Sequence, residues 1–180
     1  MNIPNFLTVL RVLLIPLFVL LFYLHTGWSY LAASAVFGLA ALTDWLDGYL
    51  ARRWQQTTAL GAFLDPVADK LMVATALLIL VEEHARLLVT LPAMVIIGRE
   101  IVVSALREWM AELGARARVA VSRLGKWKTA AQMTALLMLL ASPPAAGPWV
   151  WTGYGLLIVA AILTVWSMIL YLLAARPYLR

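Results

Sequence analysis

The stretch TDWLDGYLARRWQQTTALGAFLDPVAD, residues 43–69, indicates both the fold and the chemistry of the chain, because it sets four aspartates among apolar residues. Asp44 and Asp47 come near the end of one apolar run, and Asp65 and Asp69 come near the start of the next. Residues three or four apart lie on one face of a helix, so each pair presents its carboxylates to one side. Because the turn between the two runs is short, we expect antiparallel neighbouring helices whose carboxylates converge.

Outward from this stretch, charged or Pro/Gly-rich breaks divide the chain into six apolar runs, each long enough to cross a bilayer as a helix. These runs cover residues 5–23, 30–52, 60–81, 87–106, 124–141 and 149–175. The 180 residues are 64% hydrophobic and 13% charged, with a mean hydropathy of +0.90. A soluble domain carries about a quarter charged residues, and one of this size could not bury so many apolar side chains. We therefore predict an all-α integral membrane protein with six transmembrane helices, forming one domain over residues 1–180.

Composition also excludes several classes of function. The sequence has no cysteine, which excludes disulfides, thiolate zinc sites and cysteine nucleophiles. The net charge of +5 and the eight tryptophans agree with membrane orientation and an aromatic belt at the span ends, so we expect no nucleic acid partner. The first apolar run also resembles a cleaved signal peptide, but its length and the span directly after it favour an uncleaved helix.

The basic residues indicate the orientation in the membrane. Of the 14 lysines and arginines, only Arg86 flanks one side of the six-span layout, while Arg11, Lys70 and Arg99 fall within spans. The other ten flank the opposite side: Arg52, Arg53, Arg107, Arg116, Arg118, Arg123, Lys126, Lys128, Arg176 and Arg180. Cytoplasmic loops carry such an excess, so we expect both termini and the aspartate-bearing helix ends to face the cytosol.

The four aspartates need compensating positive charge, because a charge at membrane depth costs about 2.5–3.5 kcal/mol unless it is paired or solvated. Converging carboxylates suit hard divalent cations such as Mg²⁺ or Mn²⁺, which prefer oxygen ligands. Pro66 suggests that Asp65 caps the third helix with Pro66 in its first turn, or else that the helix kinks there. Small residues beside the carboxylates either permit close helix packing or leave room for a ligand: Gly48, Ala51 and Gly61.

The spacing of these residues also matches a family signature at every fixed position: Asp44-x2-Asp47-Gly48-x2-Ala51-Arg52-x8-Gly61-x3-Asp65-x3-Asp69. Because eight positions agree, the chain resembles the CDP-alcohol phosphatidyltransferase family with high specificity. The likeness extends to further stretches, which are similar to the bacterial branch of the family that uses sn-glycerol 3-phosphate: residues 2–11, 43–48, 98–101, 105–114 and 125–129.

The resemblance implies the family fold and a reaction in which the phosphatidyl group of CDP-diacylglycerol passes to sn-glycerol 3-phosphate, with release of CMP. It implies two Mg²⁺ or Mn²⁺ ions held by Asp44, Asp47, Asp65 and Asp69. Asp69 would also be the catalytic base that takes the proton from the acceptor hydroxyl. The CDP-lipid pocket would include Thr43, Gly48, Ala51, Arg52 and Gly61. A homodimer in the bacterial cytoplasmic membrane is implied as well.

Polar residues of the first span carry a further prediction. Asn5, Thr8 and Arg11 are spaced three apart near its start, where they either reach the CDP-lipid or extend to lipid headgroups. We assign Asn5 and Thr8 to CDP-lipid binding.

The acceptor phosphate needs cations, and from the stretches that resemble the family we expect it to be bound by Arg107, Lys126 and Lys128. Arg99, inside a span, needs either Glu100 or a bound phosphate as its partner. The two histidines, His25 and His84, are expected in solvated loops away from the carboxylates.

Two other functions stay open on the sequence. Another member of the family would use a different acceptor, such as phosphatidylglycerol to make cardiolipin, inositol phosphate or serine. A small cation-coupled transporter would also place carboxylates within the membrane, although it leaves the spacing of the glycines, alanine and arginine unexplained. Metal-dependent release of CMP with different acceptors distinguishes these functions.

Overall fold

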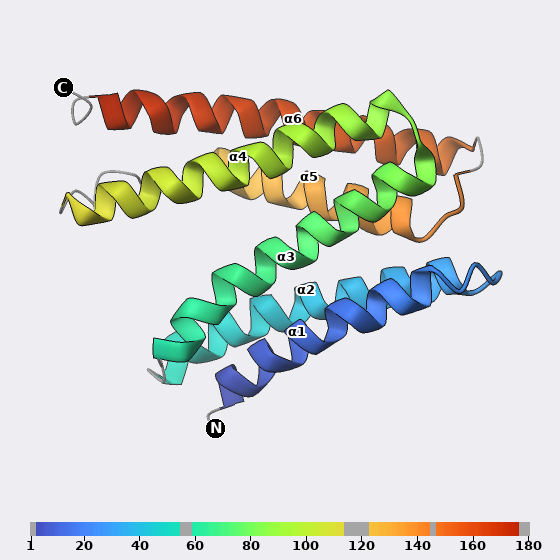
Figure 1. Cartoon of the computed structure of the whole chain (residues 1–180), viewed down its shortest axis with the longest axis horizontal. Helices are drawn as coiled ribbons and strands as arrows, with labels where there is room; N and C mark the ends of the chain where they lie inside the picture. The colour runs from blue at the N-terminus through green and yellow to red at the C-terminus, as the bar shows by residue number, and fades with distance from the viewer. Residues whose placement is uncertain (1–2, 55–58, 114–122, 145–146, 177–180) are drawn as a thin grey trace. The chain divides into compact units, whose positions relative to one another are not determined.

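Six α-helices make up the computed structural model, which describes residues 3–54, 59–113, 123–144 and 147–176 (Figure 1). The helices are α1 (Ile3–Phe22), α2 (Ser29–Trp54), α3 (Ala59–His84), α4 (Leu87–Glu112), α5 (Arg123–Leu140) and α6 (Pro148–Ala175). No strand occurs in these ranges, and the all-α prediction is confirmed. The chain divides into two compact units, one of residues 1–80 and 136–145 and the other of residues 81–135 and 146–180. One catalytic domain over residues 1–180 stays a prediction.

The predicted spans agree with the helices in number and order, and they differ mainly at the ends. α4 continues to Glu112 instead of ending at residue 106, because residues 107–112 are good helix formers that extend the hydrogen bonding past the apolar run. α3 likewise includes residues 82–84, which we expected in a loop. An apolar run therefore marks the part of a helix that lies within the bilayer, and the helix itself can continue beyond it.

The expected cap at the start of the third helix is wrong. Pro66 lies inside α3, well after the helix begins at Ala59. Asp65 therefore lies inside α3, where its side chain can extend toward a neighbouring helix. An internal proline is tolerated in a membrane helix, because neighbouring groups satisfy the backbone carbonyl that it frees.

The apolar surfaces of the helices agree with a membrane protein. α4 and α6 are long and apolar enough to cross a bilayer, over Leu87–Glu112 and Pro148–Leu173, and α1 and α2 carry shorter apolar stretches over Phe6–Phe22 and Ser29–Asp44. Large apolar side chains also lie exposed on the helices, among them Leu13, Leu31, Leu78, Ile101 and Ile162. Apolar surface of this extent is unfavourable in water and is stable against lipid.

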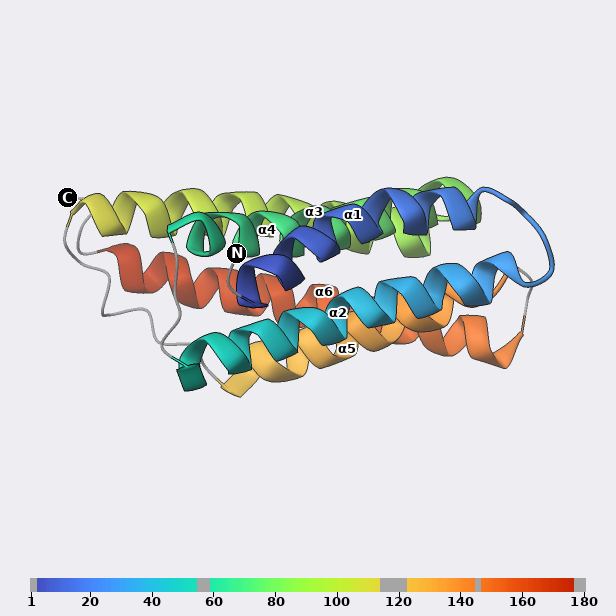
Figure 2. The same cartoon turned by 90° about the horizontal axis from the view of Figure 1, so that it is seen from below.

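In the unit of residues 1–80 and 136–145, α1 and α2 pack side by side and are joined by a short loop (Figures 1 and 2). The ring of Phe18 lies 6.0 Å from that of Phe37. The ring of Phe22 meets Tyr30 edge-on at 5.3 Å. Because these ring contacts lie toward the loop end of both helices, they fix the register in which the start of α1 meets the end of α2.

In the other unit, α4 packs against α6 (Figure 1). His84, at the end of α3, is buried, and its Nδ1 lies 2.7 Å from the hydroxyl of Tyr154 on α6. The prediction of a solvated His84 is therefore wrong, because α3 extends past its apolar run and carries this residue against α6. His25 is exposed, as predicted.

Candidate active site

Two side chains of α1 contact two of the predicted metal ligands. The Thr8 hydroxyl donates a hydrogen bond of 2.5 Å to Oδ1 of Asp65 on α3. Nη1 of Arg11 lies 2.6 Å from Oδ1 of Asp44 on α2. Thr8 and Arg11 are three residues apart and share one face of α1. Carboxylates from two different helices therefore contact one turn of a third.

Charge compensation explains the contact between Arg11 and Asp44. The side chain of Arg11 is 0% exposed, and that of Asp44 is 44% exposed. A guanidinium buried in a membrane helix is costly unless it is paired, and α1 contains no acidic residue. Arg11 therefore does not extend to the lipid headgroups, and that alternative is wrong. The sequence held a signal for this pairing, because a lone cation in an apolar helix must find its carboxylate on another helix.

The other two predicted ligands are described less fully. Asp69 lies one turn beyond Asp65 on α3 and is half-buried, and the side chain of Asp47 lies outside the described residues. Across the described part of the chain, no three Asp, Glu or His side chains gather closely enough to hold a metal ion. The structure thus places Asp44 and Asp65 against the same face of α1, and the four-ligand site stays a prediction.

The chemistry of Asp44 and Asp65 fits a hard divalent cation. Both side chains offer carboxylate oxygens, and the contacts from Thr8 and Arg11 each use Oδ1. An ionised carboxylate has about four lone-pair sites, so it can ligate an ion and keep its partner on α1. The partial exposure of Asp44 leaves its carboxylate accessible to an ion from solvent.

The residues predicted to bind the CDP-lipid lie along α1, α2 and α3. The Thr43 hydroxyl donates to the carbonyl of Ala40 in its own helix at 2.7 Å, the Thr8 hydroxyl donates to Asp65, and Gly61 is buried near the start of α3. The remaining members lie outside the residues whose side chains the structure describes: Asn5, Gly48, Ala51 and Arg52. The contact of Thr8 with a predicted metal ligand is the feature that sequence reasoning missed.

A second charged cluster, which we call the basic cluster, lies among α4, α5 and α6 and consists of Arg99, Glu100, Lys128 and Ser167. Oε1 of Glu100 accepts hydrogen bonds from Nη1 of Arg99 at 2.8 Å and from Nζ of Lys128 at 2.9 Å. Nη2 of Arg99 donates to Oγ of Ser167 at 3.2 Å. Both cations are buried. Of the two partners expected for Arg99, Glu100 or a bound phosphate, the structure shows the pairing with Glu100.

The basic cluster includes one of the three residues predicted to bind the acceptor phosphate. Lys128 belongs to it, Arg107 is exposed further along α4, and the side chain of Lys126 lies outside the described residues. Two buried cations share one carboxylate, so these side chains carry a net charge of +1. Sequence reasoning assigned Arg99 and Lys128 separately, because nothing local indicates that two helices direct them to the same oxygen.

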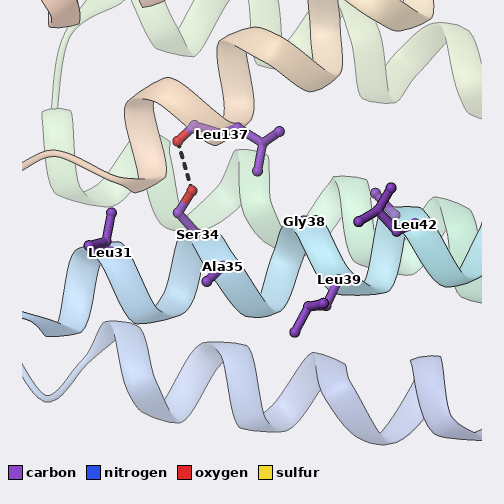
Figure 3. Close-up of a pocket in the computed structure, with 8 residues that line it drawn as sticks. Leu31, Ser34, Ala35, Gly38, Leu39, Leu42 and Leu137 are labelled. Atoms are coloured by element: carbon purple, nitrogen blue, oxygen red, sulfur yellow. Dashed lines mark hydrogen bonds between the residues drawn. The ribbon is translucent and has the colours of Figure 1, made fainter.

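An apolar groove with a volume of about 630 Å³ runs along α2 and the last turn of α5 (Figure 3). The residues that line it are Leu31, Ser34, Ala35, Gly38, Leu39, Ala41, Leu42 and Leu137. The Ser34 hydroxyl donates to the Leu137 carbonyl at 2.9 Å (Figure 3), and a Cβ at Gly38 would come within 3.3 Å of the Leu137 side chain. Small residues at these positions therefore let the last turn of α5 approach α2 closely.

Comparison with known proteins gives consistent matches over the chain. Residues 1–172 match a family model described as CDP-alcohol phosphatidyltransferase. A protein of Pseudomonas fluorescens named CDP-diacylglycerol–glycerol-3-phosphate 3-phosphatidyltransferase is 67% identical over 183 residues, covering 100% of this chain and 93% of the relative. A protein of Escherichia coli (strain K12) with the same name is 58% identical over 176 residues, covering 97% of this chain and 95% of the relative.

Proposed function

We propose a function from one premise: the chain belongs to the CDP-alcohol phosphatidyltransferase family. It transfers the phosphatidyl group of CDP-diacylglycerol to sn-glycerol 3-phosphate and releases CMP, which makes it a phosphatidylglycerophosphate synthase acting in phospholipid synthesis. The family match over residues 1–172 and the names of two relatives at 67% and 58% identity support this assignment.

The chemical step is a displacement at the phosphatidyl phosphorus. The acceptor hydroxyl oxygen forms a bond to that phosphorus, and the bond from the phosphorus to the CMP oxygen breaks. In our proposal Asp69 takes the proton from the acceptor hydroxyl, since α3 places it one turn from Asp65. A positioned general base of this kind contributes about 10²–10⁴-fold to the rate.

The observation that supports the proposal is that Asp44 and Asp65, from separate helices, contact residues of one turn of α1. Together with Asp47 and Asp69, they would hold two divalent ions, Mg²⁺ or Mn²⁺. When bound, such ions neutralise negative charge on the pyrophosphate. The four carboxylates orient them and keep the reacting groups at the end of the helices.

Residues around the carboxylates would bind the CDP-lipid. The proposed set is Asn5, Thr8, Thr43, Gly48, Ala51, Arg52 and Gly61. Arg52 contacts a phosphate, for which its planar guanidinium is well suited. The small residues let the headgroup approach the backbone while the acyl chains stay in the bilayer.

The acceptor phosphate is bound, in this proposal, by Arg107, Lys126 and Lys128. The burial of Lys128 beside a second cation, Arg99, supports its inclusion, because two neighbouring cations favour an anion. A dianionic phosphate would draw Lys128 partly away from Glu100, which Arg99 continues to neutralise.

We further propose that the protein is a homodimer in the bacterial cytoplasmic membrane, with the site and both termini on the cytosolic side. The excess of basic residues on that side supports the orientation. Since the chain has no cysteine, Glu112→Cys should react with a membrane-impermeant maleimide in inverted vesicles, and Ser142→Cys should react in intact spheroplasts. The reverse pattern would overturn the orientation.

An assay of CMP release from the purified protein in nanodiscs tests the function. We expect release to require Mg²⁺ or Mn²⁺, CDP-diacylglycerol and sn-glycerol 3-phosphate together. Release with phosphatidylglycerol, inositol phosphate or serine instead would assign another acceptor within the family. No release with any acceptor would contradict the enzyme and favour a transporter.

A further inference from the structure

We infer that two residues of α1 serve the proposed metal site: Thr8 is a positioning residue that holds Asp65 in place for the divalent ions, and Arg11 compensates the charge of Asp44 when no ion is bound. This inference rests on the proposed function, in which those carboxylates are metal ligands. It adds two residues outside the signature, and it gives Thr8 a role toward the metal site in addition to its predicted place near the CDP-lipid.

The contacts come from a part of α1 that is otherwise apolar. Thr8 is 1% exposed and Arg11 is 0% exposed, and Arg11 is the sole charged residue in the sequence of α1. Arg11 pairs with Asp44 at 2.6 Å, and Thr8 donates a hydrogen bond to Asp65 at 2.5 Å. Because both side chains are buried, these are specific contacts between helices and not chance pairings of exposed charges. Each of the two residues binds a carboxylate from a different helix.

Electrostatics explains why such contacts are needed. Neighbouring carboxylates repel one another strongly where water is scarce, so without a cation they would move apart or take up protons. The guanidinium of Arg11 supplies positive charge to Asp44 when no ion is bound. The hydroxyl of Thr8 fixes one oxygen of Asp65 and so limits the rotation of that carboxylate. Groups behind metal ligands commonly orient them in this way.

The packing of α1 makes it a firm support for these two residues. The ring contacts of Phe18 with Phe37 and of Phe22 with Tyr30 tie α1 to α2 further along the same helix. A shift of α1 along α2 would break both contacts. The positions of Thr8 and Arg11 relative to α2 are therefore set by aromatic packing that contains no ligand.

Binding of Mn²⁺ to the protein in nanodiscs, followed by electron paramagnetic resonance of the free ion, tests the role of Thr8. We expect Thr8→Val to weaken Mn²⁺ binding by roughly 10–100-fold, the usual cost of losing a group that orients a ligand. Thr8→Ser keeps the donor and should bind Mn²⁺ nearly as the wild type does. Thr90→Val is the matched control, because the Thr90 hydroxyl donates to the carbonyl of Arg86, the residue just before α4, and contacts no carboxylate in doing so.

Thermal unfolding with and without Mn²⁺ tests the role of Arg11. Arg11→Gln removes the positive charge that compensates Asp44, so the melting temperature should fall most in the absence of Mn²⁺. Added ion should then raise the melting temperature more in the variant than in the wild type, since it supplies the missing charge. Arg11→Lys keeps the charge and should behave between the two.

The outcomes separate this inference from the proposed function. If the wild-type protein binds no Mn²⁺ and releases no CMP, the proposed function fails. If the wild type does both, and Thr8→Val binds Mn²⁺ as tightly as Thr90→Val does, the role of Thr8 is overturned. An equal loss of melting temperature in Arg11→Gln with and without Mn²⁺ would make Arg11 a purely structural residue.

Discussion

The two charged clusters of this membrane protein have opposite balances of charge. Beside α1, Asp44 pairs with the guanidinium of Arg11 and Asp65 accepts a hydrogen bond from Thr8, so Asp44, Asp65 and Arg11 together carry −1. In the basic cluster, two cations meet one carboxylate, so Arg99, Lys128 and Glu100 together carry +1. The carboxylates of the first cluster suit a cation, and the two neighbouring cations of the second suit an anion.

The difference agrees with the two kinds of ligand in the proposed reaction. Divalent cations would complete the carboxylates of the first cluster, and the acceptor phosphate would complete the cations of the second. The variants below change the charge or chemistry of one cluster at a time, so that binding of cation and anion can be separated.

The largest effect is expected on the rate of CMP release, from a change among the aspartates of the proposed metal site. Asp69→Asn should lower the rate of CMP release by roughly 10²–10⁴-fold, because the amide cannot take the proton from the acceptor hydroxyl. Metal-dependent binding of CDP-diacylglycerol should persist in part, since three carboxylates remain. Single-turnover CMP release beside a lipid-binding assay measures both, and undiminished release would remove Asp69 from the mechanism.

A smaller effect, on stability, is expected at the basic cluster. Glu100→Gln leaves Arg99 and Lys128 buried without their carboxylate and should cost about 3 kcal/mol, the lower end for a broken buried pair, because Glu100 is 25% exposed. Unfolding of the purified protein in detergent measures the loss. Adding Lys128→Met should recover part of it, because a neutral side chain needs no counter-charge.

Tyr154→Phe provides the control for this comparison of stability. It removes one buried hydrogen bond, to His84, and should cost about 1 kcal/mol. A loss in Glu100→Gln no greater than this would show that the charges of the basic cluster are already well solvated.

An effect smaller than that of Glu100→Gln is expected on the affinity for the acceptor. Lys128→Gln should raise the KM for sn-glycerol 3-phosphate about tenfold, the equivalent of one charged hydrogen bond, and should leave the KM for CDP-diacylglycerol nearly unchanged. Steady-state kinetics with each substrate varied in turn measures the split. Arg86→Gln removes a cation that lies over the ring of Trp151 and should change neither KM. Equal KM values for the acceptor in both variants would contradict a role of Lys128 in acceptor binding and leave it a structural one.

Much of the fold follows from the sequence, because the length of an apolar run is set by the thickness of the bilayer. All six helices were therefore predictable, whereas their ends were not. The continuation of α4 to Glu112 and of α3 to His84 depends on helix propensity beyond the lipid and on contacts such as that with Tyr154. A local sequence pattern does not show which residue of another helix will be in contact, such as Tyr154 for His84.

The same limit applies to the candidate site. Helical spacing predicted that Asp44 and Asp65 belong to neighbouring faces, since that depends only on periodicity and a short turn. It did not predict that Arg11 selects Asp44 or that Lys128 and Arg99 share one oxygen of Glu100. Such pairings depend on how the helices pack, and several carboxylates were available to each cation in the sequence.

The most direct test is the position of bound Mn²⁺, determined by anomalous diffraction from crystals of the protein grown with the ion. We expect density within about 2.0–2.6 Å of carboxylate oxygens of both Asp44 and Asp65, the range for hard-cation ligands. Ions bound elsewhere at saturating concentration, with neither carboxylate as a ligand, would contradict it.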